Sequence, residues 1–145
     1  AKNYPRMKEK RITIQFRLEG LIPSKKNTQQ IVQNKTTKKR YIVPSYNYTN
    51  WNRKALKTLT MQAANLALKR GIKFPIGVAS LSIKFYFKDM VRRDLTNKAE
   101  SIQDTLVDAK IILDDSWLNL NPVLIQAELN SKKEHLCDIY LSFHN

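Results

Sequence analysis

The sequence has little of what organises disulfide-rich or zinc-binding proteins. It contains one cysteine, Cys137, and two histidines, His135 and His144, which lie close together near the end of the sequence. One cysteine excludes an internal disulfide, and so few Cys and His residues argue against a zinc site. No hydrophobic run approaches the roughly 20 residues that span a bilayer. These absences predict a protein of a reducing, cytoplasmic compartment that does not enter a membrane.

Acidic residues are also scarce. The 145 residues include 26 lysines and arginines against 12 aspartates and glutamates, which gives a net charge of +14. Such an excess of positive charge repels itself unless it meets a polyanion, and nucleic acid is the commonest polyanion in cells. The charge therefore favours a nucleic-acid-binding protein. A merely basic soluble protein is the alternative.

The few acidic residues are concentrated in one segment. Six of the twelve lie within residues 94–115, where only Lys98 and Lys110 oppose them. A passive DNA-binding surface gains nothing from a negative patch, whereas a site that holds divalent cations beside phosphates requires one. The six acidic residues are Asp94, Glu100, Asp104, Asp108, Asp114 and Asp115.

Hydrophobic periodicity predicts an α+β fold. Alternating apolar residues indicate strands at 11–18, 78–87, 123–129 and 136–143, the last two forming a closing pair, with a short strand at 41–43. Helical spacing indicates helices at 45–70 and 96–109, and a long lysine-rich loop fills 22–40. We expect a basic arm at residues 1–10, followed at 11–145 by a single compact domain. In this domain a small mixed sheet packs against two main helices, with Cys137 in the core.

The second predicted helix carries the acidic residues on one side. At 3.6 residues per turn, Asp94, Asn97, Ser101, Asp104 and Asp108 project together and Glu100 flanks them. Like charges at i and i+4 destabilise a helix unless a cation lies beside them. A turn after residues 111–113 can return the Asp114–Asp115 pair to the N-terminal end of this helix. The alternatives are that Asp94 is a helix cap, that Asp104 and Asp108 form a solvated face, and that Asp114–Asp115 is a plain turn.

The segment RRDLTNKAESIQDTLVDAKIILDDSW, residues 92–117, resembles the signature of the RusA family of Holliday-junction resolvases. In that family a strand leads to an aspartate motif, a helix with a further aspartate, and a paired aspartate. Residues 23–27 (PSKKN) and 45–51 are similar to two further family segments, so the resemblance covers most of the chain. In register with the pattern are Asp94, Asn97, Asp104, Asp114 and Asp115.

The resemblance implies a Mg²⁺-dependent endonuclease, with Mn²⁺ as a possible substitute, that resolves four-way DNA junctions by paired nicks during recombination and repair. It also implies a homodimer, the RusA-like fold, a bacterial or phage-infected cytoplasm, typically with a prophage origin, and no small-molecule cofactor. Asp94, Glu100 and Asp115 are the expected catalytic residues. The expected metal ligands are Asp94, Glu100, Asp104, Asp114 and Asp115.

The chain departs from the family pattern at two positions. The family's best-studied form has an aspartate where this chain has Thr96 and a lysine where it has Glu100. Positions 96 and 100 are i and i+4 on a helix, so they are neighbours on its surface. Our hypothesis is that the carboxylate has moved from position 96 to Glu100. Lys98 or Lys110 would then supply the positive charge of the family's missing lysine. Replacing Glu100 with Gln is then expected to abolish cleavage while junction binding persists.

Phosphate contacts are expected from basic residues of the loop and beside the site. These DNA-binding candidates are Lys25, Lys26, Asn27, Lys38, Lys39, Arg40, Arg92 and Arg93. Three alternatives remain open: a catalytically degenerate protein that only binds branched DNA, a Mg²⁺ nuclease acting on flaps or forks, and a structural protein that uses its acidic helix as a docking face.

Overall fold

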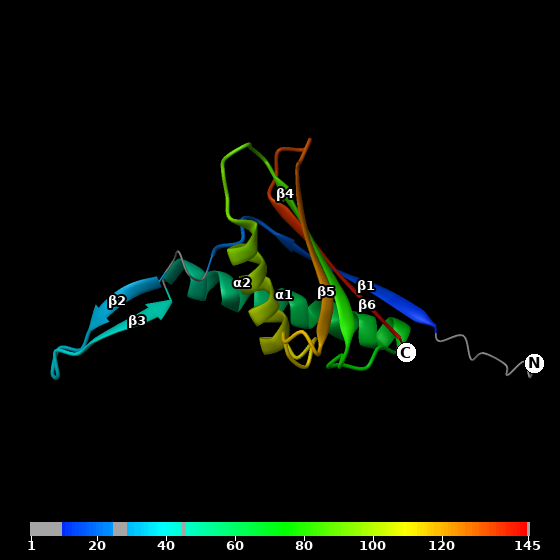
Figure 1. The fold of residues 1–145 in the computed structure, drawn as a ribbon, viewed down its shortest axis with the longest axis horizontal. Coiled ribbons are helices and arrows are strands. Elements are labelled where there is room, and N and C mark those ends of the chain that lie inside the picture. The colour runs from blue at the N-terminus through cyan, green and yellow to red at the C-terminus, as the bar shows by residue number, and fades with distance from the viewer. Residues whose placement is uncertain (1–9, 25–28, 45, 145) are drawn as a thin grey trace, which may run out of the picture.

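A four-stranded mixed sheet forms the centre of the computed structural model, which describes residues 10–24, 29–44 and 46–144. The strand order is β1-β6-β4-β5 (Figure 1). β6 pairs antiparallel with both β1 and β4, whereas β5 pairs with β4 in parallel. The strands are β1 (Arg11–Glu19), β4 (Ala79–Phe87), β5 (Leu120–Leu129) and β6 (Leu136–His144).

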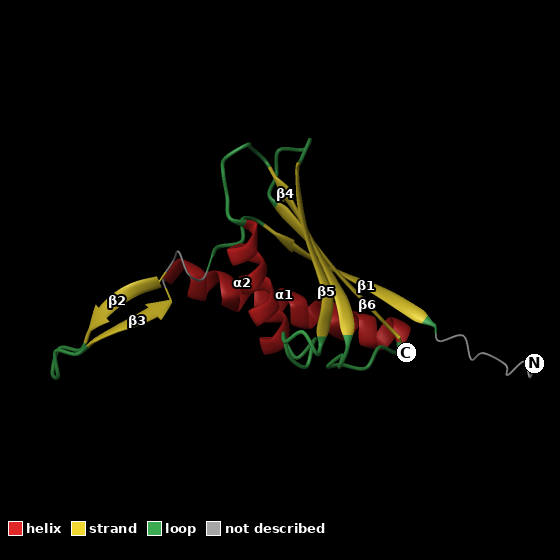
Figure 2. Ribbon diagram, in the orientation of Figure 1, coloured by secondary structure: helices red, strands yellow, loops and turns green. Residues whose placement is uncertain are grey.

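Two helices, α1 (Tyr46–Arg70) and α2 (Leu95–Asp108), cover one face of this sheet (Figure 2). Their apolar stripes bury Leu59 and Ala63 from α1, and Ile102 and Leu106 from α2, against the alternating apolar residues of the strands. Cys137 is completely buried in the same core. The predicted α+β domain of one mixed sheet and two main helices is confirmed.

A two-stranded hairpin extends away from this body. β2 (Gln29–Gln33) and β3 (Arg40–Pro44) pair antiparallel and project beyond the N-terminal end of α1 (Figure 1). The Asn34 side-chain oxygen accepts hydrogen bonds from the backbone N–H of Thr36 and Thr37, at 2.8 and 3.1 Å, which closes the tip. The prediction of a continuous loop over 22–40 was therefore wrong, because side-chain capping and cross-strand pairing order this polar segment.

The last two strands do not form a closing pair, which corrects a second prediction. β4 lies between them, since α2 acts as the crossover of a β4–α2–β5 unit and places β5 parallel to β4 at the sheet edge. Residues 1–9 of the expected basic arm lie outside the described residues. Within the described part of the chain, neither helix combines the length and apolar character needed to cross a membrane.

Candidate cation and nucleic-acid site

Asp94 caps α2. Its carboxylate accepts a hydrogen bond from the backbone N–H of Asn97 at 3.1 Å and another from the Asn97 amide Nδ2 at 3.1 Å. This is the capping role that sequence analysis held as the alternative, and it satisfies an otherwise unpaired amide of the first helical turn. Asp94 and Asp104 are ten residues apart, which corresponds to about 15 Å along the helix axis. One cation cannot contact both carboxylates within this chain.

Asp115 lies beside the C-terminal half of α2 instead. Burial raises the pKa of its carboxyl group, and the negative charges of Asp104 and Asp114 raise it further. Asp104 is in the penultimate turn of α2, so this electrostatic coupling places the pair far from the helix N-terminus. The expectation that the turn returns Asp114–Asp115 to that end was wrong. Asp104 and Asp114 thus lie within electrostatic range of Asp115, whereas Asp94 lies apart at the N-terminal end of α2.

The segment between α2 and β5 explains this position. Ile111 and Ile112 are buried, and the backbone of Ile76 bonds to Ile111 and Leu113 at 2.9 and 3.0 Å. The chain is thus held beneath the C-terminal end of α2 rather than running back along it. Asp114 follows this anchor directly, and its side chain accepts a hydrogen bond from the backbone N–H of Asp115 at 2.8 Å.

α1 contributes a residue that sequence analysis did not identify. Tyr48 is buried, and desolvation raises its pKa to about 12, with further contributions from the charges of Asp104 and Asp108. Asn52, one turn further along α1, donates a hydrogen bond to Thr105 Oγ1 at 3.0 Å, which fixes the two helices together here. The only available signal was a tyrosine on an otherwise apolar helix face, which equally describes an ordinary core residue.

The acidic side of α2 contains only part of what sequence analysis expected: of Glu100, Ser101 and Lys98, only Glu100 is exposed. Glu100 is exposed and lies one turn before Asp104, so it remains close to the acidic group. Ser101 does not project with the acids, because it is buried and donates to the Pro23 carbonyl oxygen at 2.8 Å. Lys98 is also buried, and its ammonium donates to the Ile22 carbonyl oxygen, so it cannot supply a positive charge on the acidic face. These two contacts hold residues 22–23 against α2.

The predicted DNA-binding residues have different environments. Lys38, Lys39 and Arg40 are exposed on the projecting hairpin, and Arg92 is exposed just before α2. The guanidinium of Arg93, by contrast, bonds to Asp89 at 2.7 Å and lies 4.7 Å from the centre of the Phe87 ring. Its side chain is only 12% exposed, which makes it a structural residue in this conformation. Lys25, Lys26 and Asn27 lie outside the described residues.

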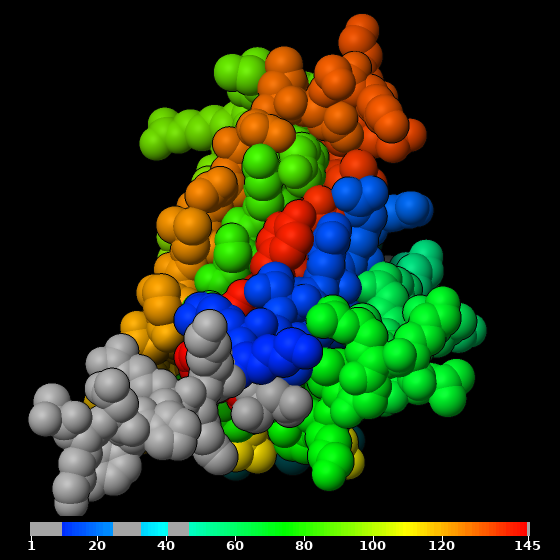
Figure 3. Space-filling model, turned by 90° about the vertical axis from the view of Figure 1, so that its right-hand side faces the viewer, coloured from blue at the N-terminus to red at the C-terminus, as the bar shows by residue number. Residues whose placement is uncertain are grey.

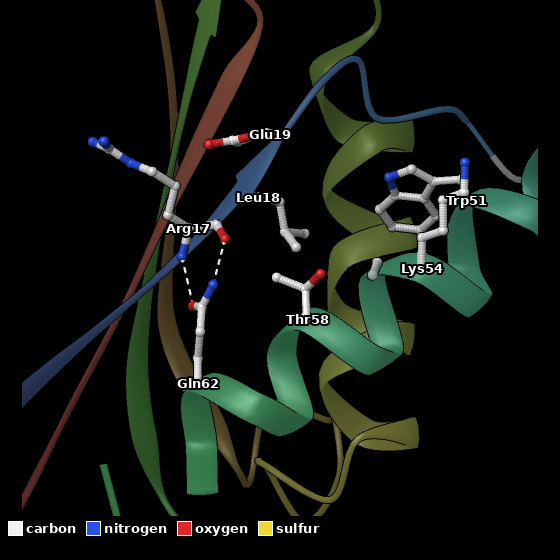
Figure 4. Close-up of a pocket in the computed structure, with 8 residues that line it drawn as sticks. Arg17, Leu18, Glu19, Trp51, Lys54, Thr58 and Gln62 are labelled. Carbon is white, nitrogen blue, oxygen red and sulfur yellow. Dashed lines mark hydrogen bonds between the residues drawn. The ribbon is translucent and has the colours of Figure 1, made fainter. Parts of the chain in front are cut away.

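A hollow between β1 and α1 lies away from the acidic group. It has a volume of about 460 Å³ and is lined in part by Arg17, Trp51, Lys54 and Gln62 (Figure 4). The backbone of Arg17 exchanges two hydrogen bonds with the Gln62 amide, at 3.0 and 2.8 Å. None of the predicted site residues lines this space, so we assign it no part in the chemistry.

No cluster of three metal-ligating side chains occurs among the residues that the structure describes. No protein-family model matches the chain, and no curated protein shows significant similarity to it. The likeness to RusA resolvases thus depends on the motif in residues 92–117 and remains a prediction.

Proposed function

We propose that the protein is a Mg²⁺-dependent endonuclease of branched DNA, a junction resolvase of the RusA type. One observation carries the proposal: in a chain of net charge +14, Asp104 and Asp114 lie near Asp115, whose pKa is raised first by burial and further by these two negative charges. Mutual repulsion of this kind is relieved by a bound cation.

The donor set fits magnesium. Mg²⁺ prefers oxygen ligands, keeps several waters, and is usually held by one or two carboxylates together with substrate phosphates. Asp104 and Asp115 would supply two carboxylates, with Asp114 and Glu100 adjacent to them. A cage of three protein ligands is therefore not required. Mn²⁺, which accepts the same ligands, is expected to substitute.

When bound, the cation would lower the pKa of a water nucleophile and neutralise charge that develops on the scissile phosphate. The surrounding side chains have separate tasks. Tyr48, with its pKa of about 12, stays protonated at neutral pH and keeps its phenol hydrogen as a donor. Arg92 and the hairpin residues Lys38, Lys39 and Arg40 would bind phosphates and position the strand.

The choice of substrate follows from the RusA resemblance. A four-way junction has near two-fold symmetry, so paired nicks require two active sites and hence a homodimer. The test is incubation of the protein and Mg²⁺ with labelled four-way junctions, flaps, forks and linear duplex. Symmetric nicks confined to the junction support resolution, whereas equal cleavage of every branched substrate would replace it with a flap or fork nuclease.

A second candidate, a branched-DNA-binding protein without cleavage, is favoured by the environment of Asp94. Its carboxylate caps α2, and Thr96 stands where the family has an aspartate. Tight, salt-sensitive junction binding with no nicks in either Mg²⁺ or Mn²⁺ would establish this candidate and reject the nuclease.

A further inference from the structure

The outer edge of β5 is open. β5 is the last strand of the sheet and, in the described part of the chain, pairs only with β4. Figure 3 shows β5 (orange) along one margin of the sheet, with β1 (blue) on the opposite side next to α1. From Val123 onward, after Pro122, which has no N–H to donate, this edge presents unpaired N–H and C=O groups that are ready to pair with another strand.

The opposite edge of the same sheet is protected. On β1 the Gln62 amide bonds to both the N–H and the C=O of Arg17, and the Arg70 guanidinium donates to the Thr13 carbonyl oxygen at 3.1 Å (Figure 4). Arg11 and Arg17 add charges along this strand. β5 has no lysine or arginine, and Glu128 is its one charged residue.

Exposed apolar side chains gather along β5 and at its two ends. Of the twelve large hydrophobic residues exposed in the described chain, eight belong to this group, which we call the β5 edge surface. Val123 and Leu129 continue the apolar row of β4 but lie beyond the cover of the helices. The members are Met90, Val91, Leu113, Trp117, Leu118, Val123, Leu124 and Leu129.

The distribution of charge along the chain favours a second copy of this chain, rather than nucleic acid, as the partner of the β5 edge surface. No lysine or arginine occurs in the 21 residues from 111 to 131, although the whole chain carries +14. Nucleic acid is therefore disfavoured along β5 itself, which has no basic residue to bind phosphates. For two copies of so basic a chain, this neutral to acidic region is the one of least mutual repulsion.

The two ends of the surface are complementary. A hollow of about 210 Å³ at the C-terminal end of β5 is lined by Phe87, Met90, Val91 and Leu129, among others. Trp117, which is 74% exposed, precedes the N-terminal end. If two β5 strands pair antiparallel about a two-fold axis, the Trp117 end of each copy lies beside the hollow of the other.

We propose that β5 is the interface between two copies of this chain, joined by antiparallel pairing of their open edges into one continuous sheet. The expectation of a homodimer rests on the proposed function, whereas the surface is identified by the fold. Tryptophan inserted into an apolar hollow is a common energetic anchor of such interfaces.

The test is sedimentation of the full chain over a concentration series, without DNA or Mg²⁺. The wild type is expected to be dimeric, and the double variant Val123→Lys/Leu129→Lys to raise the dimer dissociation constant at least about tenfold. Met61→Lys/Leu68→Lys, which replaces exposed apolar residues of α1, is the matched control and is expected to dimerise like the wild type. Thermal unfolding monitored by circular dichroism checks that each variant is folded.

A second measurement covers the case in which the lysine variant does not fold. Gln126 is exposed on β5 and Cys137 is buried, so Gln126→Cys introduces one accessible thiol at the edge. Mild oxidation is expected to cross-link two copies, whereas Gln15→Cys on β1 is expected to give little cross-linked product. A monomeric wild type, or a dimer unaffected by both β5 variants, overturns the proposal. Because no DNA is present, this outcome is distinct from failure of the nuclease assay.

Discussion

Because Tyr48 lies within electrostatic range of Asp104 and Asp108, its titration reports on the environment of Asp104. Burial chiefly raises the pKa of Tyr48 to about 12, and the charges of Asp104 and Asp108 add to the effect. The variant Asp104→Asn is therefore expected to lower the Tyr48 pKa while leaving it above the ordinary value of 10.0. The measurement is tyrosinate absorbance against pH, with Tyr48→Phe subtracted to remove the other five tyrosines. An unchanged titration would show that Asp104 is not near Tyr48.

The raised pKa of Tyr48 also makes the stability of the protein depend on pH. A phenol whose folded pKa is raised binds its proton more tightly in the folded than in the unfolded chain. The stability contributed by Tyr48 is thus fully present below pH 10 and is lost as the pH rises from 10 to about 12. Urea unfolding of the wild type and of Tyr48→Phe at pH values from neutral to about 11 measures this loss, which is expected to be smaller in the variant.

Arg17 and Asp138 form a half-buried ion pair. Two guanidinium nitrogens bond to the two carboxylate oxygens at 2.7 and 2.9 Å, and the Asp138 side chain is only 3% exposed. Removal of the arginine leaves this carboxylate without its partner. Because Arg17 is itself 52% exposed, we discount the usual penalty and expect Arg17→Leu to reduce the free energy of unfolding by about 2 kcal/mol.

The Arg17–Asp138 pair is expected to stabilise the protein less at acidic pH than at neutral pH. The hydrogen bonds from Arg17 hold the pKa of Asp138 below its ordinary value of 3.8, so its contribution is present above that pH and is lost as the pH falls below it. Urea unfolding at neutral pH and at pH values below 3.8 is expected to show a smaller acid-induced loss in Arg17→Leu than in the wild type. Arg17→Leu/Asp138→Leu is expected to recover part of the neutral-pH loss, and equal losses in the single and double variants would contradict this account.

The β2–β3 hairpin is the element from which we expect DNA affinity. It projects from the body and carries Lys38, Lys39 and Arg40 in exposed positions (Figure 1). Each phosphate contact that is removed lowers the slope of log affinity against log salt concentration by about 0.9 for duplex DNA. The triple variant to glutamine is therefore expected to bind junctions more weakly and with a slope reduced by about 2 to 3.

The matched control for this prediction uses basic residues of α1. Lys57, Lys69 and Arg70 are exposed at the helix surface, on an element distant from the hairpin tip. Replacement of all three by glutamine removes the same charge as the hairpin variant and is expected to change the salt slope by less than that variant does. Equal changes would show that affinity comes from diffuse charge rather than from the hairpin. Fluorescence anisotropy with a labelled junction measures both sets.

At the level of the whole molecule, the sequence predicted the elements better than their arrangement. Alternation at 11–18 and 136–143 and helical spacing at 96–109 reflect burial of one face, which is a local pattern. Pairing between β4 and β5 was missed, because parallel pairing depends on a crossover that no local pattern specifies. The short strand expected at 41–43 is confirmed as part of β3, whereas β2 was missed because it lies in a polar segment and its pairing depends on the Asn34 turn.

The candidate site was predicted in part for the same reason. The acidic concentration in 94–115 is visible in the sequence, and Asp104 and Asp108 share a helix face as expected. The position of Asp115 was not predictable, since it depends on burial of Ile111 and Ile112 against Ile76. Tyr48 was missed because it comes from another helix, 56 residues before Asp104 in the sequence.

The most direct test is the rate of junction nicking by the wild type and by Asp115→Asn in Mg²⁺. We predict paired, symmetric nicks from the wild type and at least about a hundredfold slower cleavage by the variant, with junction binding retained. Glu134→Gln, which removes an exposed acid in the loop before β6, is the control and is predicted to cleave normally. Undiminished cleavage by Asp115→Asn, or none by the folded wild type in either metal, would contradict the assignment of a cation-dependent nuclease centre to this end of α2.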